Sequence, residues 1–220
     1  MGYGIVLRVR GDYALFTRPE MKVERVSYDV ITPSAARGII EAIYWKPAIY
    51  WVIDKIHVIK PIKFTNIRRN EVSEKISESV PTKIIKGSTE SFFLSTNENR
   101  QQRAALVLKD VDYVIEAHFE INPEKAGSED TVEKHYNIAL RRFRKGQQYH
   151  APYLGTREFG ANVELIEEGN IPASELNGKT ELGWMLYDLN FSNLENIEPK
   201  FFRAEINDGI LDLSQVRLAG

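Results

Sequence analysis

Apolar and polar residues alternate along several stretches of the chain, and a period of two predicts strands. Residues 3–10 form the first such stretch, and Gly11 is expected to end it. Residues 113–121 alternate more regularly, which predicts a strand with one buried face and one polar face. His118 belongs to the polar face.

Other stretches are apolar without strict alternation. Residues 49–64 are rich in β-branched and aromatic side chains, which is typical of a strand buried on both faces. A shorter strand is expected at residues 161–166. Between the strands, residues 65–103 are rich in Asn, Ser and Arg, and we expect a long loop there in which residues 92–94 act as an apolar anchor.

Residues 32–47 have the pattern of one helix. Thr32 can cap its start, Pro33 suits the first helical position, and Pro47 is expected to end it. The inward-facing positions at helical spacing are Ala36, Ile39, Ile40 and Ile43. The last turn would then carry Tyr44, Trp45 and Lys46, which offers a phenol and an ammonium beside the next strand. Ordinary packing of the two aromatic rings is the alternative, and we expect Trp45 to be a packing residue.

A second helix is expected at residues 129–145, with Ser128 as its cap and Gly146 at its end. The apolar face of this helix comprises Val132, Tyr136, Ala139, Leu140 and Phe143. Its last turns are strongly basic. His135 lies among charged neighbours, so we expect its side chain to be in solvent.

The elements in order are strand, helix, strand, strand, helix and strand. This βαββαβ order predicts an α+β fold of the ferredoxin-like type, which RNA-recognition (RRM-like) modules share. Strands at 182–191, 200–206 and 210–213, with a hairpin turn at 207–209, would add a small antiparallel sheet. We therefore expect a domain at 1–168, with an insertion at about 65–103, and a C-terminal β-sheet extension at 169–220.

Composition narrows the function classes. Hydrophobic residues make up 43% and charged residues 27% of 220, as in an ordinary soluble globular protein. No apolar run approaches the roughly 20 residues that span a bilayer, and no signal peptide is visible. The absence of cysteine excludes disulfides and thiolate metal sites and fits the reducing cytoplasm.

Familiar cofactor motifs are missing. No two of the four histidines (His57, His118, His135 and His150) have metal-ligand spacing, and the chain has no phosphate-binding glycine loop and no Gly-x-Ser-x-Gly motif. We therefore expect no metal and no other cofactor.

Basic residues gather in three places, although the formal net charge is −2. They are Arg68 and Arg69; Arg100 and Arg103; and Arg141, Arg142, Arg144 and Lys145, with Arg157 following. Each group could be a solvated face, but together, in an RNA-module strand order, they favour a nucleic-acid ligand. His118 could serve as an acid or base toward an RNA 2′-hydroxyl, or be a structural residue of its strand.

Several segments together resemble one known family. They are Gly11-Asp12-Tyr13-Ala14-Leu15-Phe16-Thr17, Glu41-Ala42-Ile43-Tyr44-Trp45-Lys46-Pro47, residues 109–119, Leu154-Gly155-Thr156-Arg157-Glu158-Phe159 and residues 183–188. The family is the fifth CRISPR-associated Cas family, in its type I-C (Dvulg) branch. The resemblance covers nearly the whole chain.

This resemblance implies a RAMP-superfamily endoribonuclease for CRISPR precursor RNA. It implies cleavage without metal at the base of the repeat hairpin, and retention of the product in the type I-C interference complex with other subunits. Attack by the RNA 2′-hydroxyl would leave 2′,3′-cyclic phosphate and 5′-hydroxyl ends. The alternative is a subunit that binds the crRNA handle, or double-stranded DNA, without cutting.

The family's site residues transfer in part. Tyr44 matches its tyrosine and His118 its histidine, but Glu116 and Ala117 stand where a lysine would precede that histidine. Lys46 is the expected substitute cation. The basic residues named above are the expected RNA-binding set.

Overall fold

The structure is a computed structural model that describes residues 3–89, 93–167, 171–191, 193 and 195–219. In chain order its elements are β1 (Gly4–Ala14), β2 (Arg25–Val26), α1 (Pro33–Ile43), β3 (Ile49–Val58), β4 (Phe64–Val72), α2 (Ser79–Ile85), β5 (Arg100–Ile121), α3 (Val132–Arg144), β6 (Asn162–Leu165), β7 (Lys179–Asn190), β8 (Glu198–Asn207) and β9 (Ile210–Asp212).

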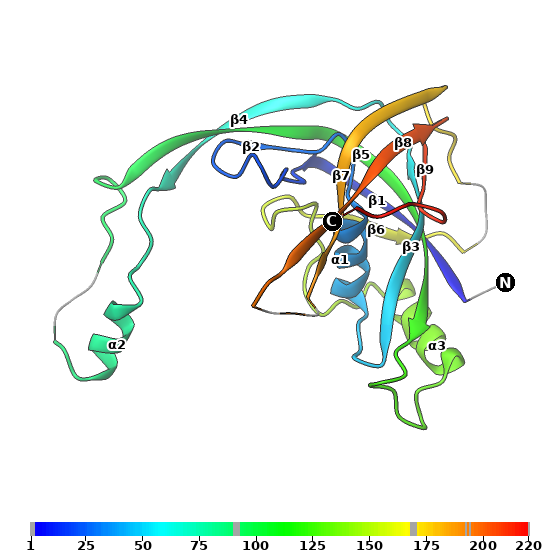
Figure 1. Ribbon diagram of the computed structural model, residues 1–220, viewed down its shortest axis with the longest axis horizontal. Coiled ribbons are helices and arrows are strands. Elements are labelled where there is room, and N and C mark those ends of the chain that lie inside the picture. The colour runs from blue at the N-terminus through cyan, green and yellow to red at the C-terminus, as the bar shows by residue number, and fades with distance from the viewer. Residues whose placement is uncertain (1–2, 90–92, 168–170, 192, 194, 220) are drawn as a thin grey trace.

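A large, mainly antiparallel sheet with few helices dominates the fold (Figure 1). Its strand order is β6-β1-β5-β3-β9-β8-β7, while β4 and the short β2 pair with β5 outside this path. Neighbours along the path are antiparallel, and only β2 runs parallel to its partner among the described pairs. The longest strand, β5, pairs with β1 from Gly4–His118 to Ala14–Leu108.

Helices α1 and α3 lie on one face of this sheet, and the apolar core lies between the helices and the sheet. On this face of β5 lie Ile115, Ala117 and Phe119, all buried. The ring of Phe119 packs edge-on against Trp51 of β3 and against His135 of α3. The alternation at residues 113–121 thus produces the predicted strand, with its apolar face turned toward the helices.

The N-terminal ends of both helices are capped by threonine side chains. Thr32 Oγ1 accepts a hydrogen bond from the Ala35 N–H at 3.2 Å, and Pro33 follows at the first helical position. Thr131 Oγ1 accepts from the Lys134 N–H at 3.2 Å, so Thr131, and not the expected Ser128, starts the second helix.

Strand β4 and the first half of β5 form a long two-stranded arm (Figure 1). This corrects the expectation of a structureless loop over 65–103, because β4 pairs with β5 from Phe64–Leu108 to Val72–Arg100. Polar side chains suit β4 because its residues are alternately exposed and half-buried, and none of them is fully buried. Helix α2, beyond it, contains no buried residue.

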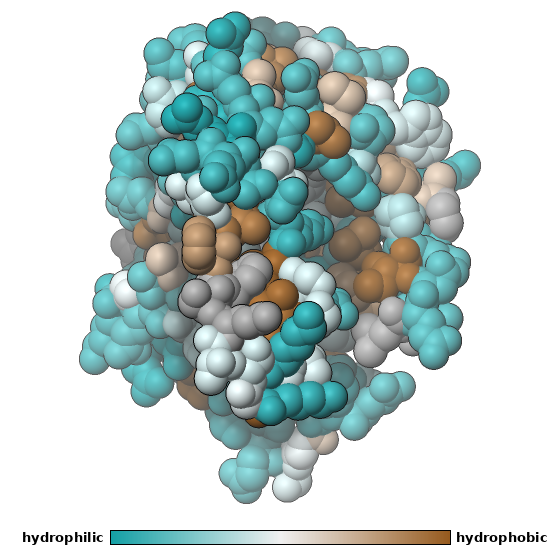
Figure 2. All heavy atoms as spheres, turned by 90° about the vertical axis from the view of Figure 1, so that its left-hand side faces the viewer, coloured by the Kyte–Doolittle hydropathy of each residue, from teal (hydrophilic) through white to brown (hydrophobic). Residues whose placement is uncertain are grey.

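The surface on the arm side is mostly hydrophilic, with hydrophobic residues in a band across its middle (Figure 2). The apolar anchor expected at 92–94 is not confirmed. Phe92 lies outside the described residues, and Phe93 is 77% exposed.

The C-terminal strands continue the same sheet. β9 pairs with β3, and β8 and β7 follow, so that Met185 and Phe202 join the same apolar core as Ile56. The hairpin turn predicted at 207–209 is confirmed, and its two residues between β8 and β9, Asp208 and Gly209, have the positive φ angles that a tight hairpin requires. Strand β1 runs past the expected break at Gly11 to Ala14. In the described part of the chain, no helix combines the length and apolar character that crossing a membrane requires.

Candidate active site

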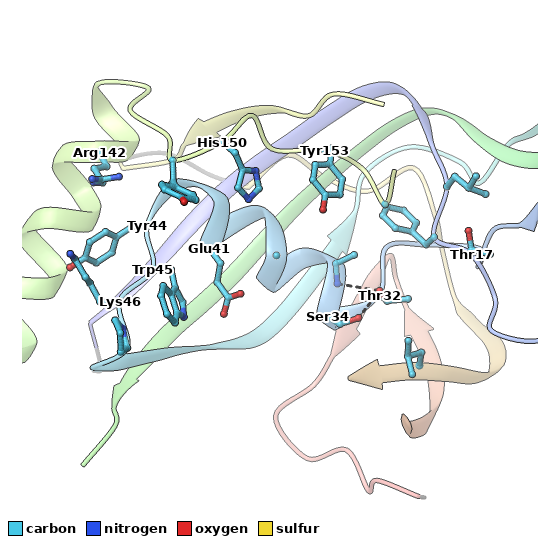
Figure 3. A pocket seen from close by; sticks show the side chains of 18 residues that line it. Thr17, Thr32, Ser34, Glu41, Tyr44, Trp45, Lys46, Arg142, His150 and Tyr153 are labelled. Atoms are coloured by element: carbon cyan, nitrogen blue, oxygen red, sulfur yellow. Dashed lines mark hydrogen bonds between the residues drawn. The ribbon is translucent and has the colours of Figure 1, made fainter. Parts of the chain in front are cut away.

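A cavity of about 960 Å³ runs along α1 between the helix and the loop that follows α3 (Figure 3). Its lining comes from segments that are distant in sequence: Leu15, Phe16, Thr17, Thr32, Ser34, Ala35, Gly38, Glu41, Tyr44, Trp45, Lys46, Pro47, Arg142, Tyr149, His150, Tyr153, Gly155 and Leu186. We call it the α1 groove. Tyr44 and Lys46, both expected as site residues, lie at one end of it.

Tyr44 reaches this position because α1 stops one residue before it. The helix ends at Ile43, not within the expected turn 44–46, and Tyr44 has extended backbone angles of φ −146° and ψ 116°. Its N–H still donates to the Ile40 carbonyl at 2.9 Å, while its carbonyl accepts from Trp51 Nε1 at 2.9 Å. These two bonds hold the backbone, and the extended conformation turns the phenol toward α3.

Three side chains lie next to one another in a row, in the order Tyr44, His135 and Asp130. Tyr44 Oη lies 2.7 Å from His135 Nδ1, within hydrogen-bond range, and both side chains are buried. On the other side of the ring, His135 Nε2 lies 3.2 Å from Asp130 Oδ1. A phenol, an imidazole and a carboxylate in this sequence resemble the nucleophile, base and orienting acid of a catalytic triad.

Burial and hydrogen bonds set the charges at the two ends of this row. Burial raises the pKa of the Tyr44 phenol, so it stays protonated at neutral pH. The Gly127 N–H and then Lys134 hold the pKa of Asp130 below its ordinary value, so Asp130 stays ionised. A protonated phenol can therefore donate to His135 Nδ1, while His135 Nε2 approaches the Asp130 carboxylate without completing a hydrogen bond to it.

Cationic side chains lie close to this row. The Arg142 guanidinium is 5.7 Å from the centre of the Tyr44 ring, and its Nη1 donates to the Ile43 carbonyl at 3.0 Å. Lys46 is exposed at the end of the groove. When a phosphodiester is cleaved, negative charge develops on its phosphoryl oxygens. Cationic side chains beside the phenol–imidazole pair can stabilise that charge.

The structure does not bring His118 to Tyr44. His118 is on the face of β5 opposite Phe119, turned away from both helices. There its Nδ1 lies 2.9 Å from both oxygens of Asp54, and its Nε2 lies 3.7 Å from Glu120. The histidine beside Tyr44 is instead His135, which corrects the expectation that His135 is in solvent.

The expected RNA-binding residues fall into three regions. Arg68, Arg69, Arg100 and Arg103 lie on the β4–β5 arm, Arg141, Arg142, Arg144 and Lys145 at the end of α3, and Arg157 in the turn before β6. Some are engaged within the protein. Arg69 pairs with Glu158, Arg103 approaches Glu71, and Arg144 binds Glu167 through two nitrogens.

The family comparison supports the resemblance on which these expectations rest. A family model described as CRISPR-associated protein (Cas_Cas5), for the Cas5d type, matches residues 4–213. The chain belongs to the Cas5d family.

Two relatives named "CRISPR pre-crRNA endoribonuclease Cas5d" are similar to this member of the family. The protein from Mannheimia succiniciproducens is 52% identical over 218 residues, which cover 97% of this chain and 96% of that protein. The protein from Thermus thermophilus is 43% identical over 185 residues, 84% of this chain and 72% of that protein.

Solved structures show the same fold. A structure titled "Crystal Structure of CRISPR-associated Protein" has a TM-score of 0.70 at 26% identity and covers 100% of this chain and 97% of that one. A functionally uncharacterized protein from Streptococcus mutans has a TM-score of 0.69 at 24% identity and covers 100% of this chain and 98% of its own.

Three features of the candidate site were not predicted from the sequence. His135 has the spacing of a buried stripe, since the buried residues of α3 are His135, Ala139 and Phe143 at intervals of four. That spacing was a signal available in the sequence. Trp45 is 53% exposed and lines the groove, so it is not the expected packing residue. Asp130 lies in the loop before α3, and no pattern in the sequence indicated that its carboxylate would approach His135.

Proposed function

We propose that this protein is an endoribonuclease that cleaves CRISPR precursor RNA. The observation that carries the proposal is the 2.7 Å contact between Tyr44 Oη and His135 Nδ1 at the wall of a groove large enough for RNA. The name of the M. succiniciproducens relative, 52% identical over 97% of this chain, supports the same activity.

The proposed reaction uses the nucleophile that RNA itself carries. The 2′-oxygen attacks the adjacent phosphorus, so a 2′-O–P bond forms while the P–5′-O bond breaks. The proton of the 2′-hydroxyl passes to the oxygen of Tyr44 as the phenol proton moves to His135 Nδ1. The departing 5′-oxygen takes a proton from water, the imidazolium loses its extra proton to the hydroxide so formed, and the products are a 2′,3′-cyclic phosphate and a 5′-hydroxyl. This sequence of steps requires no metal.

Asp130 and the nearby cations complete this assignment. The carboxylate facing His135 Nε2 stabilises the imidazolium that forms when the proton arrives. Lys46 and Arg142 are placed to stabilise the charge on the phosphoryl oxygens. We transfer the histidine's role from His118 to His135, because His118 lies on the opposite face of the sheet beside Asp54.

We also propose that the N-terminal part of the chain is a ferredoxin-like domain. The order β6-β1-β5-β3, with α1 and α3 as crossovers, supports a ferredoxin-like domain of the RAMP type at 1–168 and a β-sheet extension at 169–220. A chain without cysteine suits the cytoplasm, where such a processing enzyme would meet its transcript.

We assign recognition of the RNA hairpin to the shape of its double helix and to the negative charge of its phosphates. The exposed basic residues of α3 and of the arm can follow an RNA backbone, and double-stranded RNA is recognised mostly in this way. Cleavage at the base of the hairpin, with the product retained beside other subunits of the type I-C complex, follows from the family.

The test is cleavage of the protein's own repeat RNA in EDTA, with the ends mapped chemically. We expect 2′,3′-cyclic phosphate ends, and we expect Tyr44→Phe and His135→Ala each to slow single-turnover cleavage by roughly 100- to 10,000-fold. His118→Ala is the matched control and should cleave at close to the wild-type rate. Tight hairpin binding without cleavage by the wild type would instead establish a subunit that only binds the crRNA handle. Double-stranded DNA binding is measured in parallel.

A further inference from the structure

The α1 groove extends beyond Tyr44 into a region of different chemistry. At the Tyr44 end the lining is cationic, with Lys46 and Arg142. Farther along, it is aromatic and acidic: Trp45 and Glu41 project from one side, and the loop at 149–153 supplies rings on the other (Figure 3). A phosphate suits the first part, and a planar group with hydrogen-bond donors suits the second.

The loop after α3 offers a short series of rings. His150 and Tyr153 are stacked, with centroids 6.1 Å apart and an interplanar angle of 27°. Tyr149 meets His150 edge-on at 6.0 Å and is 87% exposed, and Trp45 across the groove is 53% exposed. Exposed aromatic faces that line a groove are the surfaces on which unpaired bases stack.

Glu41 makes this aromatic region selective. Its carboxylate is 3.5 Å from Arg37 Nε, but Arg37 is directed mainly at Asp188, which it binds through both terminal nitrogens. Burial raises the pKa of Glu41 because it removes water from the carboxylate that lines this groove, and a ligand that donates hydrogen bonds to the carboxylate would replace that water. A carboxylate repels phosphate and accepts hydrogen bonds only, so the group that fits beside it presents donors.

We propose that this part of the α1 groove binds an unpaired guanine of the RNA, next to the scissile phosphate. The base stacks on Trp45 and the His150–Tyr153 pair, and its N1–H and 2-amino group donate to the two oxygens of Glu41. Guanine alone among the four bases has two adjacent donors on its Watson–Crick edge. Adenine and cytosine each present one donor beside an acceptor, and uracil presents one donor between two acceptors.

This inference rests on the proposed function, because it places the base beside the Tyr44–His135 pair. The arrangement follows from the order of groups along the groove. When a phosphate of the RNA lies between Lys46 and Arg142, the base of the adjoining nucleotide can reach Glu41, which lies in the last turn of α1, three residues before Tyr44.

The experiment measures binding of four 5′-fluorescein pentaribonucleotides, UUGUU, UUIUU with inosine, UUAUU and UUUUU, to the full-length protein by fluorescence anisotropy. We expect UUGUU to bind roughly 5- to 100-fold more tightly than the others, including the inosine probe, which lacks only the 2-amino group. Glu41→Gln should abolish this preference, because an amide offers one acceptor and one donor. Trp45→Ala should weaken all four probes by roughly 5- to 100-fold, with Trp45→Phe restoring most of the binding.

Trp184→Ala is the matched control, since Trp184 is an exposed tryptophan of β7 that does not line the groove. Equal affinity of the wild type for the guanine, inosine and adenine probes would overturn the proposed guanine site, and this comparison requires no variant. Unchanged affinity in Trp45→Ala would overturn the stacking. Repeat-RNA cleavage by the same preparation separates the two proposals. Cleavage without guanine preference rejects only the guanine site, and guanine preference without cleavage rejects only the endoribonuclease.

Discussion

Asp130 acts at the scale of single residues, through the histidine that it faces. Its carboxylate accepts from the Gly127 N–H at 3.0 Å, which fixes it at the turn before α3. From there Oδ1 lies 3.2 Å from His135 Nε2. Nε2 completes no hydrogen bond to this carboxylate, so Asp130 acts on the ring through its negative charge, while Nδ1 meets the Tyr44 hydroxyl.

Asp130→Asn is therefore expected to slow cleavage without loosening RNA. An amide in place of the carboxylate no longer stabilises the imidazolium, so we expect the single-turnover rate to fall by roughly 100-fold or more. The dissociation constant for repeat RNA should stay within about 2-fold, because Asp130 does not line the groove. Rate and affinity are measured on the same preparation.

Two variants show whether Asp130 acts by position or by stability. Asp130→Glu keeps the charge and should recover part of the rate, whereas a residue needed only to cap the loop would not be rescued in this way. Glu129→Gln is the matched control because it neutralises the adjacent acid, whose side chain has no described contact with His135. Equal losses of rate in Asp130→Asn and Glu129→Gln would contradict the positioning role.

Only part of this candidate site could be predicted from the sequence. Tyr44 could be predicted because a cap, an apolar stripe and a proline define the helix that carries it. His135 was hidden by its neighbours, since Glu133 and Lys134 make the start of α3 look solvated although positions 135, 139 and 143 are the buried ones. The sequence could not show that His118 and Tyr44 lie on opposite faces of the sheet, because a polar strand face predicts exposure but not which face the helices cover.

At the scale of elements, the basic residues at the end of α3 differ in whether an acidic side chain of the protein already pairs with them. Arg144 donates to Glu167 through Nε at 2.9 Å and Nη2 at 2.7 Å, so its charge is largely matched within the protein. Arg141 and Lys145 are exposed on the same helix end, and neither has a described ion pair. The charges available to RNA are therefore fewer than the sequence suggests.

We expect Arg141→Ala and Lys145→Ala each to reduce the salt dependence of hairpin binding by about one unit in the slope of log K against log salt. Arg144→Ala should change that slope less, because the substitution also releases Glu167. Dissociation constants across a salt series test this, and the three variants are controls for one another. Equal slopes for all three would contradict the distinction.

The arm is the element that the sequence concealed. Its residues are polar on both faces, so neither the buried-strand pattern nor the half-buried pattern applied to residues 65–103. Pairing with β5 supplies the regularity that the side chains do not, since backbone hydrogen bonds form whatever the side chains are. The neighbouring strands were predictable because each has a face in the core.

For the whole molecule, one core holds the N-terminal and C-terminal parts together. The buried residues that share it include Leu7, Ile115, Phe202 and Leu211. Arg37 of α1 also binds Asp188 of β7, so the helix that ends at Tyr44 is held from the C-terminal strands. The sequence predicted the strands at both ends of the chain. It could not predict that β7 lies against α1, because that contact depends on how the sheet curves.

Four tyrosines connect this core to the pH dependence of stability. Burial raises the pKa of Tyr28, Tyr44, Tyr113 and Tyr187, most strongly for Tyr113, which lies on the helix-facing side of β5. In the unfolded chain a tyrosine ionises near its ordinary pKa of about 10. Above that pH the unfolded chain has therefore lost protons that the folded protein keeps.

The free energy of unfolding should accordingly be independent of these tyrosines below about pH 10 and fall as the pH rises further. Each tyrosine that stays protonated contributes a slope of about 1.4 kcal/mol per pH unit. Urea unfolding at several pH values from 8 to 11, with phenolate absorbance followed in parallel, measures this slope. Tyr113→Phe should make it shallower by about that amount, while Tyr149→Phe, at an exposed position, should leave it unchanged. Unfolding free energies that stay level to pH 11 would show that the buried phenols ionise without unfolding the protein.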